Sequence, residues 1–181
     1  MEQSDEMLVA LYLNGDESAL SHLIERYFNP IYRYVYRFVR TAAAAEDVVQ
    51  ETFIKVWKSA RSLKEGATVK PWLYRIAHNT AIDYLRKKKQ LNFSEMTQDA
   101  HAEALFSDDT VDILEQTIAR EERAALTATI EALPAHYREV ILLRGTENLS
   151  FEEISTIIDK PIATVRSLYR RGLLLLQKQL S

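Results

Sequence analysis

The sequence SFEEISTIIDKPIATVRSLYRRGLLLLQKQ, residues 150–179, predicts two helices separated by a tight break. Ser150, with Glu153 three residues later, matches a capping box at the start of a short helix. Its buried side is expected to be Ile154, Ile157 and Ile158. Asp159-Lys160-Pro161 interrupts this helix, and a longer basic helix follows over about 162–179. A capped short helix, a break and a longer helix form a helix-turn-helix arrangement.

The longer helix is predicted to have two different faces. An apolar stripe, expected to pack onto Ile154 and Ile158, consists of Val165, Leu168, Tyr169, Gly172 and Leu176. A second stripe consists of Ala163, Arg166, Ser167, Arg170 and Arg171. Guanidinium groups and a hydroxyl suit the guanine edges and phosphates of a DNA major groove. An ordinary helical hairpin with a solvated basic face would show the same pattern.

The composition favours a helical fold throughout. The 181 residues include only 4 Gly and 4 Pro, far fewer than the turns of an all-β fold require. Cysteine is absent, which excludes disulfides, cysteine-zinc sites and thiol nucleophiles. No apolar run approaches the length of a membrane-spanning helix, and the first residues are acidic. We therefore expect an all-α cytoplasmic protein without direct membrane insertion.

Charge is strongly segregated along the chain, although the net charge is only −3. Residues 61–90 carry 8 basic and 2 acidic side chains, whereas residues 91–119 carry 7 acidic and no basic ones. The apolar periodicity also degrades over much of this acidic stretch, which is typical of a flexible linker. The sequence thus predicts two small helical domains, 1–90 and 120–181, joined by an acidic linker over 91–119.

Helical spacing predicts most of the remaining elements. The expected helices are one capped by Asp5 and stopping at Gly15, followed by 16–40, 42–59, 71–89, 119–133 and 135–144. Pro30 should kink or break the second of these helices. Residues 62–70 are expected to form a loop because they contain Gly66 and lose the periodicity. Pro71 would then be the first residue of the helix that follows.

The helix over 71–89 is expected to bury Leu73, Ile76, Ala77, Thr80 and Tyr84. A separate face collects Trp72, Arg75, Asn79, Asp83 and Arg86. A ring, a guanidinium and an amide on one face suit stacking on unpaired bases and hydrogen bonding to them. The run 86–89, Arg-Lys-Lys-Lys, can hold phosphates. Alternatively, Trp72 is a core residue and the basic run is a solvated helix end.

The helix over 42–59 is expected to place Val49, Phe53, Val56 and Trp57 toward the core. A different side carries Asp47, Gln50, Glu51 and Ile54. A polar stripe with one apolar residue is either ordinary surface or a contact for a partner helix, and periodicity does not separate the two.

Three motifs occur together in a familiar order. These are AEDVVQETF at 45–53, PWLYRIAHNTA at 71–81, and the run from Leu133-Pro134 through SFEEI at 150–154 to TVRS at 164–167. Over essentially its whole length the chain resembles a bacterial sigma factor of the sigma-70 family. With two domains only, it is similar to the small extracytoplasmic function (ECF) group.

The resemblance implies a role for each face. Asp47, Gln50, Glu51 and Ile54 would contact the coiled coil of the polymerase β′ subunit. Melting and reading of the minus-ten element, on the non-template strand, would involve the 62–70 loop with Trp72, Arg75, Asn79, Arg86 and Lys87. Duplex recognition at the minus-thirty-five element would involve Arg166, Ser167, Arg170 and Arg171, while this domain rests on the β flap. The acidic linker would thread the polymerase cleft, and many relatives are held inactive by an anti-sigma factor.

Two positions depart from the family pattern, and two other classes of function remain to be weighed. Ala163 stands where Gly is common, and Leu168 where a second Arg is frequent. A helix-turn-helix regulator that does not join polymerase would leave the faces on 42–59 and 71–89 without a role. An enzyme is disfavoured because no catalytic constellation or phosphate-binding glycine loop is present. We expect no cofactor, no metal and no small-molecule substrate, since no imidazole supports the carboxylates of Asp47 and Glu51.

Overall fold

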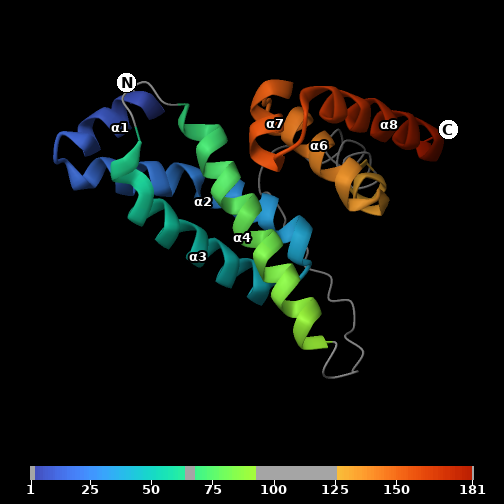
Figure 1. The fold of residues 1–181 in the computed structure, drawn as a ribbon, viewed down its shortest axis with the longest axis horizontal. Coiled ribbons are helices and arrows are strands. Elements are labelled where there is room, and N and C mark those ends of the chain that lie inside the picture. The colour runs from blue at the N-terminus through green and yellow to red at the C-terminus, as the bar shows by residue number, and fades with distance from the viewer. Residues whose placement is uncertain (1–2, 64–67, 93–125, 181) are drawn as a thin grey trace, which may run out of the picture. The chain divides into compact units, whose positions relative to one another are not determined.

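The computed structural model describes residues 3–63, 68–92 and 126–180, and all regular elements within these ranges are helical. Figure 1 shows them in chain order, from blue to red. They are α1 (Asp5–Leu13), α2 (Glu17–Val39), α3 (Ala42–Ser59), the 3-10 turn η1 (Ala60–Ser62), α4 (Val69–Asn92), a helix over 126–132, α6 (Ala135–Gly145), α7 (Phe151–Ile158) and α8 (Ile162–Leu180). The predicted all-α class is confirmed.

The chain divides into two compact units, 1–102 with 156–158 and 103–155 with 159–181. The acidic linker predicted over 91–119 lies almost entirely outside the described residues. Its first two positions, Leu91 and Asn92, belong to α4 instead. The boundaries 1–90, 91–119 and 120–181 therefore stay a prediction.

Helix α2 lies against three other helices, since it packs on α1, α3 and α4. The side chains that fill the space between them are almost completely buried, and the largest are Leu8, Leu23, Ile31, Val35, Val48, Val49, Val56, Leu73 and Tyr74. These aliphatic and aromatic groups lose contact with water on folding, which is the main source of stability for such a bundle. In the first unit, one face of α3 and one face of α4 are therefore buried in the core, and their other faces are exposed to solvent.

The residue that caps the first helix is Ser4. The expectation that Asp5 would cap it is wrong. The Ser4 hydroxyl accepts a hydrogen bond of 3.2 Å from the backbone N–H of Met7. The Asp5 carboxylate instead accepts hydrogen bonds from Arg26 and from the Tyr27 hydroxyl on α2. Burial, together with the neighbouring Asp5, raises the pKa of Tyr27 above its usual value of 10. Asp5 therefore ties α1 to α2 instead of closing the end of α1.

Two expectations that rested on proline need correction. Pro30 lies inside α2, and the helix continues through it to Val39, so the expected break is absent, whereas the kink stays a prediction. The residues that follow, Ile31 and Val35, are completely buried, so packing offsets the missing N–H. Helix α4 begins at Val69, two residues before Pro71. Proline is tolerated there because the first turn of a helix has no backbone partners for its N–H groups.

Helices α7 and α8 form the predicted helix-turn-helix, which is confirmed. Ser150 and Glu153 form the capping box in both directions, with hydrogen bonds of 3.2 and 2.7 Å. Helix α7 ends at Ile158, and the next residue, Asp159, adopts a left-handed conformation with φ of 51°. Helix α8 packs against α6. Ile141 of α6 and Leu176 of α8 form a buried cluster with Leu133, and Ile130, Tyr169 and Leu175 pack against it.

Candidate functional site

The outer face of α3 carries all four residues that the sequence analysis singled out there. Asp47, Gln50, Glu51 and Ile54 are exposed, because Val48, Val49, Phe53 and Val56 face the core. Glu51 forms an ion pair of 2.9 Å with Lys55, one turn further along. Lys55 also donates a hydrogen bond of 3.1 Å to Thr80 on α4. The α3 face is therefore a continuous surface of carboxylates and an amide with an apolar end.

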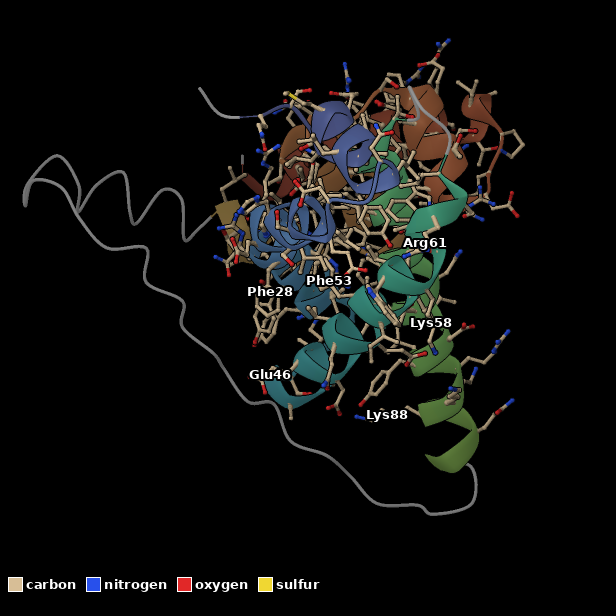
Figure 2. The ribbon with its side chains drawn as sticks, turned by 90° about the vertical axis from the view of Figure 1, so that its left-hand side faces the viewer. Phe28, Glu46, Phe53, Lys58, Arg61 and Lys88 are labelled. Carbon is tan, nitrogen blue, oxygen red and sulfur yellow. The ribbon has the colours of Figure 1, made fainter. Side chains whose placement is uncertain are left out.

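An apolar groove of about 550 Å³ borders this face. It is lined by Ile24, Phe28, Glu46, Gln50, Phe53, Ile54 and Trp57, which come from α2 and α3. Figure 2 shows Phe28 beside Phe53, with Glu46 nearer the start of α3. The two phenylalanine rings stack with centroids 5.9 Å apart. Two of the four α3 face residues, Gln50 and Ile54, thus also line an apolar hollow.

Trp57 was expected in the core, and this expectation is wrong. Its side chain is 63% exposed and forms part of the groove wall. Trp57 lies four residues after the buried Phe53 and three after the exposed Ile54, so its spacing fits either face. Phe28 was missed altogether, although it is 45% exposed. Only the pairing of α2 with α3 brings these residues together.

The face predicted on α4 is also present. Arg75, Asn79, Arg86 and Lys87 are exposed and Trp72 is half-buried, whereas Leu73, Ala77 and Ala81 are buried. Arg86 is held by Asp83 at 2.8 Å, on the same face. Of the expected buried side, Ile76 and Tyr84 are only half-buried, while Tyr74, which was not anticipated, is completely buried. Four residues of the preceding loop, 64–67, lie outside the described residues.

The basic stripe of α8 faces away from its packing side. Arg166, Ser167, Arg170 and Arg171 are exposed, and Val165, Gly172 and Leu176 are buried. Arg166 lies 3.3 Å from the Glu152 carboxylate of α7, and its guanidinium lies 5.7 Å from the centre of the Phe151 ring. Phe151 also contacts Tyr169 edge to face. The start of α7 and the middle of α8 therefore form one connected surface.

Within the described ranges, no group of three or more acidic or histidine side chains is placed to hold a metal ion. Among the helices described there, none is both long and apolar enough to cross a membrane.

Comparison with known proteins assigns both halves of the chain. The model for sigma-70 region 2 matches residues 23–91, and the model for sigma-70 region 4 matches residues 123–176. The first match covers α3 and all but the last residue of α4, and the second covers α7 and most of α8.

Curated relatives extend over nearly the whole chain. The RNA polymerase sigma-H factor of Pseudomonas aeruginosa is 34% identical, over 92% of this chain and 88% of the relative. The ECF RNA polymerase sigma-E factor of Escherichia coli K12 is 35% identical, over 91% of this chain and 87% of the relative.

Solved structures show the same fold. The sigma factor RpoE of Bartonella quintana, in complex with the anti-sigma factor NepR, has a TM-score of 0.73 at 22% identity, covering 88% of this chain and 95% of that one. CnrH, in complex with the cytosolic domain of CnrY, has a TM-score of 0.69 at 22% identity, covering 98% and 97%.

The chain therefore belongs to the sigma-70 family of RNA polymerase sigma factors. Within that family it is a member of the ECF group, whose sigma-E factors are among the relatives it matches. A sigma factor binds core RNA polymerase and directs it to specific promoters, where it promotes melting of the DNA for transcription initiation.

Proposed function

We propose that this sigma factor divides its work among the three exposed faces of α3, α4 and α8. In this assignment α3 binds core polymerase, α4 melts and reads the minus-ten element, and α8 reads the minus-thirty-five element. The protein acts in the cytoplasm through binding energy alone, without a catalytic group, cofactor or metal. The observation that carries the proposal is that all three polar stripes lie on sides of their helices that the core leaves uncovered.

The α3 face suits the coiled coil of the polymerase β′ subunit. Exposed Ile54 and Trp57, with Phe28 on α2, provide apolar area for the apolar side of a partner helix. Glu46, Asp47 and Glu51 supply negative charge along the same edge. Carboxylates around an apolar centre favour a helix flanked by basic side chains and steer its approach.

The α4 face suits a melted DNA strand. Trp72 offers an aromatic surface for stacking, and Arg75 and Asn79 supply donors for base edges on the same face. Arg86 and Lys87 lie at the following turns, where their charges attract phosphates. Capturing unpaired bases of the non-template strand stabilises the open form of the promoter and thus drives melting without ATP.

The α8 face suits an intact duplex. Arg166, Ser167 and Arg171 are assigned to base edges in the major groove, and Arg170 to phosphate. Leu173 and Leu174 are 43% and 55% exposed near the end of the same helix. They give this unit an apolar surface for the polymerase β flap.

An antagonist is part of the proposal. Both solved neighbours named above were determined with a partner chain bound, one of them an anti-sigma factor. An anti-sigma factor for this chain would act by covering the α3 face, because polymerase cannot dock on a surface that is already occupied.

The test replaces the α3 face and measures binding to core RNA polymerase. Combining Asp47→Ala, Gln50→Ala and Glu51→Ala should abolish co-purification with core enzyme, since the three side chains are exposed and contribute little to folding. As a matched control, Glu6→Ala with Glu25→Ala removes two exposed carboxylates outside the face and should leave binding intact.

Near wild-type binding by the α3 triple variant would refute the assignment of that face. If the wild-type chain bound duplex DNA but never joined core polymerase, it would instead act as an independent helix-turn-helix regulator.

A further inference from the structure

Arg166, the residue assigned to base recognition, is not a freely rotating side chain. Its Nη2 donates to the Glu152 carboxylate at 3.3 Å, and its guanidinium lies over the Phe151 ring at 5.7 Å. Both contacts come from the first turn of α7, which precedes α8 in the helix-turn-helix. A guanidinium held by a carboxylate and an aromatic ring has a restricted orientation.

The carboxylate of Glu152 takes no part in the capping box of α7. The capping box uses the neighbouring glutamate, Glu153, whose side chain accepts the hydrogen bond from the Ser150 backbone N–H at 2.7 Å. The Glu152–Arg166 pair is itself about 60% exposed on both sides. Exposed ion pairs contribute little to folding, so stability does not explain this contact.

The position of Glu152 lowers the affinity of this face for DNA of any sequence. Its negative charge lies 3.3 Å from Arg166 in the basic stripe of α8, the face assigned above to duplex DNA. Phosphate attraction supplies most of the affinity for DNA of arbitrary sequence, and a nearby carboxylate weakens it. A correct base pair can still be recognised, because four of the five N–H donors of Arg166 remain available for the two acceptors on guanine.

We propose that Glu152 is a specificity-determining residue that acts through Arg166. It orients the guanidinium for guanine and repels phosphate where no guanine is presented, which lowers the affinity for incorrect sequences more than for the correct one. This inference rests on the proposed function of α8. Glu152 is a positioning residue here and need not touch the DNA.

The experiment uses the full chain assembled with core RNA polymerase. A library of duplexes randomised over the upstream promoter positions is bound by the wild-type holoenzyme, and the most enriched duplex is compared with its scrambled counterpart. The affinity ratio for these two probes is then measured for Glu152→Gln, for the control Glu153→Gln, and for Arg166→Ala with and without Glu152→Gln. Glutamine at the control position keeps the capping box while it removes the same charge one residue away.

Glu152→Gln should lower the affinity ratio about fivefold, the upper range for an exposed charge pair, and chiefly by tightening binding to the scrambled duplex. Glu153→Gln should leave the ratio unchanged. In the Arg166→Ala background, Glu152→Gln should have no further effect on the ratio.

Three results would overturn the inference. One is an unchanged ratio in Glu152→Gln while the wild type selects a clear motif. Another is an equal change in both glutamine variants, which would mean that charge alone matters. The third is equal weakening on both probes together with a lower unfolding temperature. A wild-type chain that selects no motif would overturn the proposed function of α8 itself.

Discussion

Gly172 lies where α8 comes closest to α6. A Cβ at this position would be 2.6 Å from the Cδ1 of Ile141 and 3.3 Å from the Cβ of Tyr137. Both distances are shorter than normal carbon–carbon contacts, so an added methyl group would displace the end of the Ile141 side chain and press on Tyr137. Because α8 carries the basic stripe and packs on α6, this position links helix packing to the DNA recognition proposed for α8.

Gly172→Ala should therefore destabilise the second unit in spite of the better helix propensity of alanine. Overpacking costs about 1–3 kcal/mol and the propensity gain recovers about 1 kcal/mol, which leaves a net loss of about 1 kcal/mol. Thermal unfolding followed by circular dichroism measures this loss. In the Ile141→Val background, which lacks the Cδ1 atom but keeps the two contacts of 3.3 Å, the loss caused by Gly172→Ala should be smaller. An equal loss in both backgrounds would show that Ile141 is not the obstacle.

At the scale of single residues, the sequence predicts the N-terminal capping residue of a helix well only where one residue is suited to that position. Ser150 was correctly placed, because Glu153 completes its capping box. At the start of α1, Ser4 and Asp5 are both good capping residues, and the sequence favoured the wrong one. The choice depends on Arg26 and Tyr27 of α2, which take the Asp5 carboxylate away from the helix end.

Among the elements, α3 has the most clearly divided surface. Val56 is completely buried, whereas the next residue, Trp57, is 63% exposed and lines the apolar groove. An exposed tryptophan in an apolar hollow contributes little to folding, but it is the kind of residue that dominates the binding energy of an interface. The two adjacent residues should therefore respond to truncation in opposite ways.

Trp57→Ala should change the free energy of unfolding by less than about 0.5 kcal/mol, as expected for an exposed side chain. It should weaken binding to core polymerase at least about tenfold, the effect of losing an interface anchor. Val56→Ala is the control, and it should cost more than about 1 kcal/mol of stability through lost burial while the folded protein binds normally. Denaturant titration and a direct binding assay measure the two effects. The groove would have no role in binding if Trp57→Ala bound core polymerase like the wild type.

Element boundaries were predicted within a few residues wherever local chemistry decides them. Helix α3 spans the expected residues because Thr41 precedes it and accepts a hydrogen bond from Ala44. The break expected at Pro30 is absent because α2 packs against three helices, and this packing is not visible in the local sequence. The burial of Trp57 was predicted wrongly for the same reason, because its spacing fits both the buried and the exposed face of α3.

For the whole molecule, the distribution of charge is more informative than its sum. The net charge of −3 would argue weakly against nucleic acid, whereas the basic residues gather in 61–90 and along α8. The polar faces of α3, α4 and α8 were found from motifs and spacing, because each belongs to one helix. The apolar groove was not found from the sequence, because it is formed by residues of both α2 and α3.

The most direct test of the central claim is run-off transcription with purified core RNA polymerase and this chain on a library of genomic fragments. We predict transcripts that appear only when both components are present and whose upstream sequences share two elements at a constant spacing. The combined Asp47→Ala, Gln50→Ala and Glu51→Ala variant should give none of them. Transcription that is independent of the added chain, or start sites without a shared motif, would contradict the account.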